Sequence, residues 1–216
     1  MTTEEVVKSK LPNLIKEVRH DLSDWVWHFT RRDGQPFETL KKIVASNRIL
    51  GSQDKFCTEK AVCLTEMPLT EAYRQSKLLD ANAYNRFSDY GLGFKKDWIA
   101  GKGGLPVIYQ PNSMLTLLDP SARWRHCELD FSRGIDFTWQ REWRVPGDEL
   151  CFMPTDDVLI VVRTGEEAME IATDNWEFDH ERDEVFFDVI WSYVTHDDLA
   201  AAKHPADIET LRTVAG

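Results

Sequence analysis

The run Ile135–Val145 carries polar side chains, among them Glu142, that could take part in a reaction. The run is rich in aromatic and branched residues, which predicts a strand with alternating faces. The polar face of this predicted strand carries Thr138, Gln140, Glu142 and Arg144. A carboxylate held in such company can act as a general base, stabilise a cationic transition state or bind sugar hydroxyls. The alternative interpretation is a structural ion pair of Glu142 with Arg141, Arg144 or another cation on the sheet.

His28 and Thr30 lie two residues apart in a short aromatic run, Trp25–Thr30, that also predicts a strand. They therefore share one face, and three aromatic side chains, Trp25, Trp27 and Phe29, occupy the other. A ring nitrogen and a hydroxyl on one strand face can hydrogen-bond to a polar ligand. The alternative is a histidine whose ring nitrogens are satisfied within a turn.

Other familiar motifs are weak or missing. Tyr90–Gly93 contains Gly-x-Gly without the third glycine of a dinucleotide fingerprint, and Gly101–Gly104 lacks the spacing of a phosphate-binding loop. The six histidines show no metal-ligand spacing, so no metal site is predicted. The cysteines are scattered without a Cys-x-x-Cys pair, which is typical of a reducing cytosol.

Helices and strands alternate unevenly along the chain. The predicted helices cover 3–22, with a break near Pro12, then Pro36–Asn47, Pro68–Phe87, Lys95–Gly101, Gly165–Thr173, His196–Lys203 and Ala206–Val214. Further strands are predicted over Ala61–Thr65, Tyr90–Phe94, Leu105–Gln110, Asp157–Val162 and Glu184–Trp191. This order favours a single α+β domain over residues 1–216 and not a doubly wound sheet. We expect an N-terminal helical segment (1–24), a core (25–162) and an acidic C-terminal extension of helix and strand (163–216).

The composition narrows the choice of partners. Hydrophobic residues make up 42% of the chain, including 8 Trp and 11 Phe, so a packed core is feasible. Apolar runs fall well short of a membrane span, and the polar N-terminus is unlike a signal peptide, so we expect a cytoplasmic protein without a membrane partner. Residues 1–150 carry 22 Lys and Arg against 21 Asp and Glu, whereas residues 151–200 carry 2 against 14. The net charge of −11 therefore belongs to one segment, and a general polyanion-binding surface is disfavoured.

Three groups of segments together resemble one family of phage-defence proteins. The first group is His28–Thr30 with the helix Phe37–Ile43 and Ile49–Leu50, the second is Val62–Leu69 with Tyr90–Trp98 and Pro106–Tyr109, and the third is Arg141–Gly147 with Asp157–Ile160. The second group resembles the AbiGi-like abortive phage-infection proteins. The first and third groups are similar to ADP-ribosyltransferases of the DarT kind, which have a His-Phe-Thr strand and a late catalytic glutamate.

This resemblance implies an ADP-ribosyltransferase-like core, in which a split β-sheet is flanked by helices, and NAD as the co-substrate. It implies that His28, Phe29, Thr30 and Tyr90 bind NAD. It also implies that Glu142 is the catalytic residue and engages the nicotinamide ribose. The DarT-like enzymes have an arginine shortly after the second strand, and here Arg74 is the nearest substitute.

The function predicted first is therefore an NAD-dependent ADP-ribosyltransferase-like toxin or effector of bacterial anti-phage defence. Its acceptor would be a nucleic acid or a protein. The alternative is a non-catalytic binding module of the same fold that serves as antitoxin or regulator and binds a partner protein. A third interpretation, a relative of the RNA 2′-phosphotransferases, also uses NAD but expects a more basic surface.

Overall fold

The computed structural model of the protein describes most of the 216 residues: 19, 21–32, 34–53, 59–78, 87–154, 156, 158–173, 176–179, 184–187, 191–202 and 213–214. The side chains of residues 77–78, 173, 176–179, 184–187 and 213–214 are not described. The predicted helix over residues 3–22 lies outside this set except at 19, 21 and 22, where the chain is not helical.

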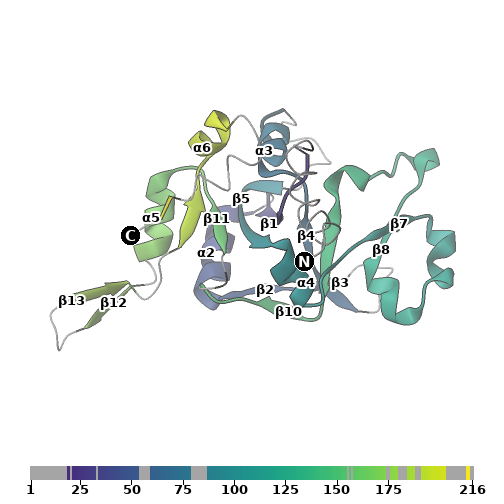
Figure 1. The fold of residues 1–216 in the computed structure, drawn as a ribbon, viewed down its shortest axis with the longest axis horizontal. Helices are drawn as coiled ribbons and strands as arrows, with labels where there is room; N and C mark the ends of the chain where they lie inside the picture. The colour runs from purple at the N-terminus through teal and green to yellow at the C-terminus, as the bar shows by residue number, and fades with distance from the viewer. Residues whose placement is uncertain are drawn as a thin grey trace, which may run out of the picture.

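A nine-stranded sheet forms the centre of the molecule (Figure 1). Its order is β15-β14-β11-β5-β1-β4-β9-β6, and β3 also pairs with β4. The bounds are β1 (Trp25–Arg31), β3 (Ser52–Gln53), β4 (Lys60–Thr65), β5 (Phe87–Lys95), β6 (Leu105–Pro106), β9 (Glu142–Pro146), β11 (Leu159–Val161), β14 (Ser192–Val194) and β15 (Thr213–Val214). The β11–β14 pair is parallel and the other pairs are antiparallel, so the sheet is mixed. The predicted α+β class is confirmed.

Helices cover both faces of this sheet. One core contains residues of α2 (Pro36–Ser46), α4 (Lys96–Gly101) and α5 (Gly165–Thr173). There Leu40 and Val44, one turn apart on α2, join Val26 of β1. The opposite core contains residues of α3 (Leu69–Leu78) and α6 (His196–Ala201), where Leu69 and Leu199 join the two tryptophans of β1. The alternation along β1 therefore supplies both cores.

The tryptophan at the centre of β1 fixes how closely β5 approaches. Trp27 is 2% exposed, and its ring lies against Gly93 of β5, where a Cβ atom would overlap the ring. The glycines at positions 91 and 93 thus allow close backbone approach of β5 to β1.

Three small two-stranded sheets surround the centre. β2 (Arg48–Leu50) pairs with β10 (Glu149–Cys151), β7 (Ile108–Gln110) with β8 (His126–Glu128), and β12 (Trp176–Asp179) with β13 (Glu184–Phe187). The β12–β13 hairpin projects at one end of the molecule, and β7 and β8 lie in a lobe at the other end (Figure 1). The lobe also holds the 3₁₀ turns η1 (Asn112–Leu117), η2 (Pro120–Arg125) and η3 (Phe131–Arg133), and η4 (Thr138–Gln140) leads out of it.

The predicted strand over Ile135–Val145 is wrong in its first half. Residues 138–140 form the 3₁₀ turn η4, and β9 begins only at Glu142. The carboxylate of Asp136 accepts hydrogen bonds from the backbone N–H and the hydroxyl of Thr138 at 2.9 and 2.6 Å, which starts the turn. Arg141 then adopts a left-handed conformation, with φ of 49°. Of the predicted polar face, Glu142 and Arg144 remain on one strand.

Other boundaries also differ from the predictions. The predicted helix over Pro68–Phe87 is wrong at its end, because Phe87 begins β5, and residues 79–86 lie outside the described set. The predicted strand Leu105–Gln110 is interrupted at Val107, whose N–H donates to the carbonyl of Glu142. In the predicted C-terminal helix the described residues, Thr213–Val214, form a strand.

Candidate functional site

A cleft opens where β1 and β4 separate. The two strands share the pair Trp27–Thr65, beyond which β1 stays paired with β5 as far as Arg31. The cleft has a volume of about 540 Å³, which lies within the usual range of small-molecule sites. Its lining residues come from six strands, one helix and the turn before β9: Trp27, His28, Phe29, Thr30, Arg31, Thr39, Leu50, Ser52, Ala61, Cys63, Leu64, Thr65, Phe87, Gln140 and Glu142.

His28 spans the split between the two strands. Its Nδ1 lies 2.9 Å from the carbonyl oxygen of Cys63 on β4. Burial lowers the pKa of His28 below its usual 6.5, and the carbonyl of Cys63 only partly opposes this shift. A carbonyl can only accept, so the neutral ring carries its proton on Nδ1, and Nε2 is left as an acceptor. His28 can therefore accept a hydrogen bond from a hydroxyl group of a ligand.

Thr30 lines the same cleft, but its hydroxyl is already bonded within the protein. The side chain is 3% exposed, and its Oγ1 lies 2.6 Å from Oγ of Ser88 and donates to the carbonyl of Tyr90 at 3.2 Å. Phe29 points to the other side of β1, and its ring centre lies 5.1 Å from that of Phe87. Thr30 and Phe29 thus shape the wall that β1 presents.

Glu142 approaches the cleft from β9, where it pairs with Thr65. Its Oε1 accepts a hydrogen bond from Nε of Arg144 at 2.8 Å, and the two side chains are 12% and 7% exposed. Nη1 of Arg144 also donates to the carbonyls of Trp124 and His126, both at 2.9 Å. Burial disfavours the charged guanidinium, but Glu142, together with the neighbouring Cys63 and Cys127, raises the pKa of Arg144. The ion pair predicted as the alternative is present, and it holds the carboxylate in one place.

Cys63 is a lining residue that the sequence patterns did not single out. It pairs with Arg144 across β4 and β9, and it is exposed towards the cleft. Desolvation, together with the charge of Glu142, raises the pKa of its thiol to about 12. The thiol therefore stays protonated near neutral pH and is a poor nucleophile there. The predicted strand Ala61–Thr65 was the signal that could have found it, because Cys63 shares one face of that strand with Thr65.

Tyr90 does not line the cleft. It is 3% exposed, its hydroxyl donates to Glu167 at 2.7 Å, and its ring centre lies 5.2 Å from that of Phe37. Strand β5 lies on the far side of β1 from β4, and Tyr90 packs with residues of α2 and α5. The structure therefore places it away from His28 and Glu142.

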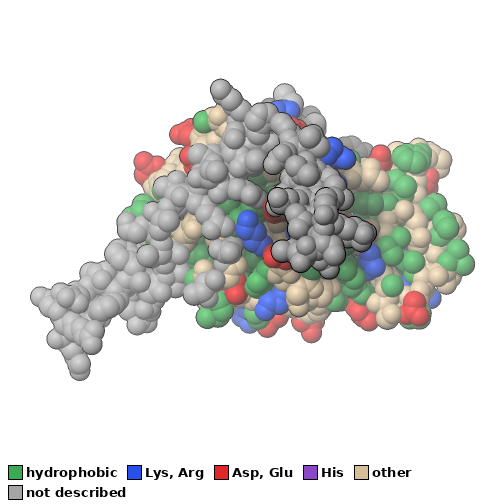
Figure 2. All heavy atoms as spheres, viewed as in Figure 1, with side chains coloured by type: hydrophobic (Ala, Val, Ile, Leu, Met, Phe, Trp, Pro, Cys, Tyr) green, Lys and Arg blue, Asp and Glu red, His purple; other side chains and the backbone are tan. Residues whose placement is uncertain are grey.

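Arg74 does not line the cleft either. It is exposed on α3, where it forms an ion pair with Glu71 at 2.8 Å. Arg31 does line the cleft, and its side chain is exposed. Across the described atoms of the face in Figure 2, Lys and Arg side chains lie scattered among Asp and Glu. Within the described residues, no group of three His, Cys, Asp or Glu side chains is placed to hold a metal ion.

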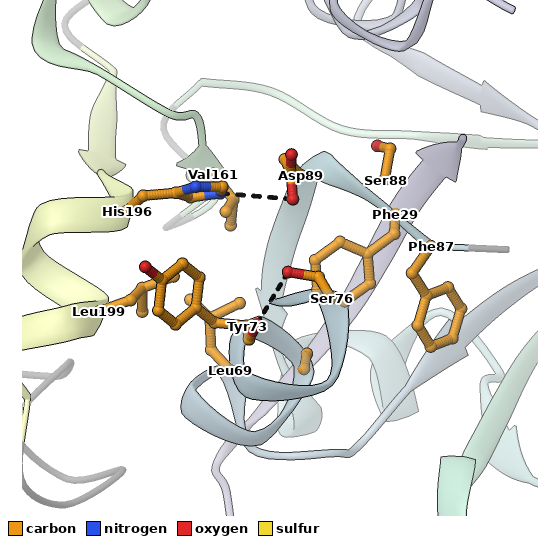
Figure 3. A pocket seen from close by; sticks show the side chains of 11 residues that line it. Phe29, Leu69, Tyr73, Ser76, Phe87, Ser88, Asp89, Val161, His196 and Leu199 are labelled. Carbon is orange, nitrogen blue, oxygen red and sulfur yellow. Dashed lines mark hydrogen bonds and ion pairs between the residues drawn. The ribbon is translucent and has the colours of Figure 1, made fainter. Parts of the chain in front are cut away.

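A second, much smaller cavity lies behind Phe29, between β5 and the helices α3 and α6 (Figure 3). Nε2 of His196 lies 3.9 Å from a carboxylate oxygen of Asp89 at its edge, and the ring of Tyr73 stacks edge-on against His196. The cavity measures about 10 Å³, which is room for a single water molecule. The cleft between β1 and β4 is therefore the better candidate for a ligand site.

No family model, curated protein or solved structure matches this chain. Among the described helices, none combines the length and the apolar character that crossing a bilayer requires.

Proposed function

We propose that this chain is a cytosolic, NAD-dependent ADP-ribosyltransferase-like effector of anti-phage defence that modifies a nucleic acid or a protein. One observation supports the proposal above all. His28, Phe29 and Thr30 of β1 and Glu142 of β9, more than a hundred residues apart in sequence, line one cleft at a split in the sheet. Its size suits a nucleotide moiety.

The chemistry follows from the two sides of the cleft. Breaking the bond between nicotinamide and ribose sends the bonding electrons to nicotinamide and leaves positive charge on the ribose. The carboxylate of Glu142 stabilises this charge more than it stabilises the neutral ribose of the ground state. Nε2 of His28 accepts a hydrogen bond from a ribose hydroxyl and holds the sugar in place. A nucleophile of the acceptor then forms the new bond to the ribose and releases its proton to solvent.

A non-catalytic binding module is the second candidate, and two contacts favour it. The Oε1 atom of Glu142 is bonded to Arg144, and the hydroxyl of Thr30 is bonded to Ser88 and Tyr90. Groups committed to the protein are less available for a reacting substrate. Such a module would serve as an antitoxin or regulator, and the acidic segment after residue 150 would suit a basic partner protein.

The test uses three forms of the full chain: wild type, Glu142→Gln and the control Glu128→Gln. Glu128 is 14% exposed and ion-paired like Glu142, but its partner is Arg133 in the β7–β8 lobe. NAD binding is measured by calorimetry, and NAD turnover is followed by release of nicotinamide. We expect the wild type and the control to consume NAD, and Glu142→Gln to bind NAD without consuming it.

The other outcomes separate the candidates. NAD binding without turnover in the wild type would support the binding module. An absence of NAD binding would overturn the interpretations that require NAD. Turnover by Glu142→Gln at the wild-type rate would remove Glu142 from the mechanism. Growth after induction of wild type or Glu142→Ala in bacterial cells tests the toxin role, because only the active form should arrest growth.

A further inference from the structure

The carboxylate of Glu66 binds the residues on either side of Glu142, which are Arg141 and Trp143. Glu66 directly follows β4, and its side chain is 13% exposed. Its Oε1 accepts from Nη2 of Arg141 at 2.7 Å and from Nζ of Lys96 at 3.1 Å. Its Oε2 accepts from Nε1 of Trp143 at 2.8 Å. The backbone N–H of Glu66 donates to the carbonyl of Arg141 at 3.0 Å, which extends the pairing of the two strands by one step.

One of the residues that Glu66 binds has a strained backbone conformation. Arg141 has φ of 49° and ψ of 51°, a left-handed conformation that costs a residue with a side chain about 1 kcal/mol or more. This conformation turns the chain from the 3₁₀ turn η4 into β9 immediately before Glu142. The contacts of Glu66 with Arg141 oppose relaxation of the turn.

The contacts of Glu66 reach β9 partly on the face opposite Glu142. Side chains alternate along β9, so Trp143 points to the opposite face from Glu142 and Arg144. Trp143 packs against the core that contains α2 and α4, whereas Glu142 lines the cleft. Glu66 thus binds Trp143 on that face, and Arg144 holds the carboxylate of Glu142 from the side.

We propose that Glu66 is a positioning residue for Glu142, which it fixes at the cleft by binding Arg141 and Trp143. The inference rests on the proposed function, in which Glu142 stabilises charge on the ribose. Electrostatic stabilisation requires a carboxylate whose place is set before the reaction, and a displacement of about 1 Å can lower a rate by about a hundredfold. Glu66 does not line the cleft, so it acts on the reaction through its neighbours.

The charge of Glu66 is required, because each of its partners is a donor. Arg141, Lys96 and Trp143 all present N–H groups to its two oxygens. Glutamine has the same shape, but one of its two terminal atoms is itself a donor. In Glu66→Gln at least one of these contacts therefore becomes donor against donor, and the turn at Arg141 loses part of its support.

The experiment compares Glu66→Gln with the control Glu128→Gln, a carboxylate of similar exposure that is ion-paired to Arg133 and does not line the cleft. For Glu66→Gln we expect kcat for NAD turnover to fall by about tenfold to a hundredfold while KM stays unchanged. The variant Trp143→Phe keeps an aromatic ring and removes the N–H that reaches Glu66 together with part of the indole, and should lower kcat in the same direction by a smaller factor. It keeps the proposal testable if Glu66→Gln does not fold.

A second readout requires no activity. The charge of Glu142 helps to raise the pKa of the Cys63 thiol, so moving or neutralising that carboxylate should make the thiol easier to ionise. Alkylation of Cys63 by iodoacetamide, followed by mass spectrometry of its peptide, should be faster in Glu66→Gln and Glu142→Gln than in the wild type. Glu128→Gln should label at the wild-type rate.

The two readouts separate the two claims. A wild type without NAD turnover, combined with faster Cys63 labelling in Glu66→Gln, overturns the proposed function and keeps Glu66 as the residue that positions Glu142. Labelling of Glu66→Gln and Trp143→Phe at the wild-type rate overturns the positioning role. A rise in KM without a fall in kcat would also overturn it, because that pattern indicates lost binding and not a misplaced carboxylate.

Discussion

We predict that breaking the ion pair between Glu142 and Arg144 lowers the stability of the fold. Arg144 is 5% exposed, and its guanidinium holds three groups at once: Oε1 of Glu142 at 2.8 Å and the carbonyls of Trp124 and His126 at 2.9 Å. Arg144→Met keeps most of the side-chain volume and removes the guanidinium. Glu142 would then remain as a largely buried charge without its partner.

The expected loss follows from how little water reaches the pair. Removing one partner of a buried ion pair lowers the free energy of unfolding by about 3–5 kcal/mol, whereas an exposed pair contributes about 0.2–1 kcal/mol. Glu142 and Arg144 belong to the first class, since their side chains are 12% and 7% exposed. We therefore expect Arg144→Met to lose about 3–5 kcal/mol, measured by urea unfolding at pH 7 and followed by tryptophan fluorescence.

Two further variants complete this measurement. Arg133→Met breaks an ion pair whose arginine is 59% exposed, so it should lose no more than about 1 kcal/mol. Adding Glu142→Gln to Arg144→Met removes the buried charge, so the double variant should be more stable than Arg144→Met alone. A loss below about 1 kcal/mol for Arg144→Met, or no recovery in the double variant, would show that the pair is solvated and refute this reasoning.

Two other predictions concern β1 and its contact with β5. Gly93→Ala should lower the free energy of unfolding by about 1–3 kcal/mol, because its Cβ would overlap the ring of Trp27. The control Gly101→Ala, where a Cβ meets no atom within 4 Å, should have a far smaller effect. Equal urea midpoints for the two variants would contradict this prediction. Burial lowers the pKa of His28 below 6.5, so the unfolded chain takes up this proton first, and stability should fall as pH drops below about 6.5. Unfolding measured from pH 7 to pH 5 should show a shallower decline for His28→Gln, and identical slopes would remove His28 as the cause.

The elements that build the cleft could largely be predicted, because their patterns are local. Alternating side chains indicated the strand Trp25–Thr30 and placed His28 and Thr30 on one face. Proline at the start and apolar residues one turn apart indicated the helix from Pro36, which the left-handed Asn47 ends. A short apolar run indicated β4. Each of these signals depends on residues within a few positions of one another.

The turn before Glu142 and the direction of Tyr90 could not be predicted in the same way. The run around Trp139 has strand composition, but one carboxylate, that of Asp136, bonds to Thr138 and starts a 3₁₀ turn instead. Alternation along a strand predicts which face of the sheet Tyr90 shares with Thr30. It does not predict on which side of β1 the strand that carries Tyr90 pairs. That side depends on the strand order, which contacts distant in sequence decide.

The ion pair also determines where a bound ligand can interact favourably with the carboxylate of Glu142. Two unit charges 4 Å apart interact by about 4 kcal/mol near a protein surface, so a guanidinium as close to the ribose as the carboxylate would cancel the benefit. Arg144 donates to the carbonyls of Trp124 and His126, neither of which lines the cleft, and its Nε donates to Oε1 of Glu142. Glu142 lines the cleft and Arg144 does not, so under the proposed function a cationic ribose bound there would meet the carboxylate and not the guanidinium. Under the proposed function, the pair that stabilises the fold is compatible with catalysis in the cleft, and the position of Glu142, together with the contacts of Glu66 that set it, would decide the activity.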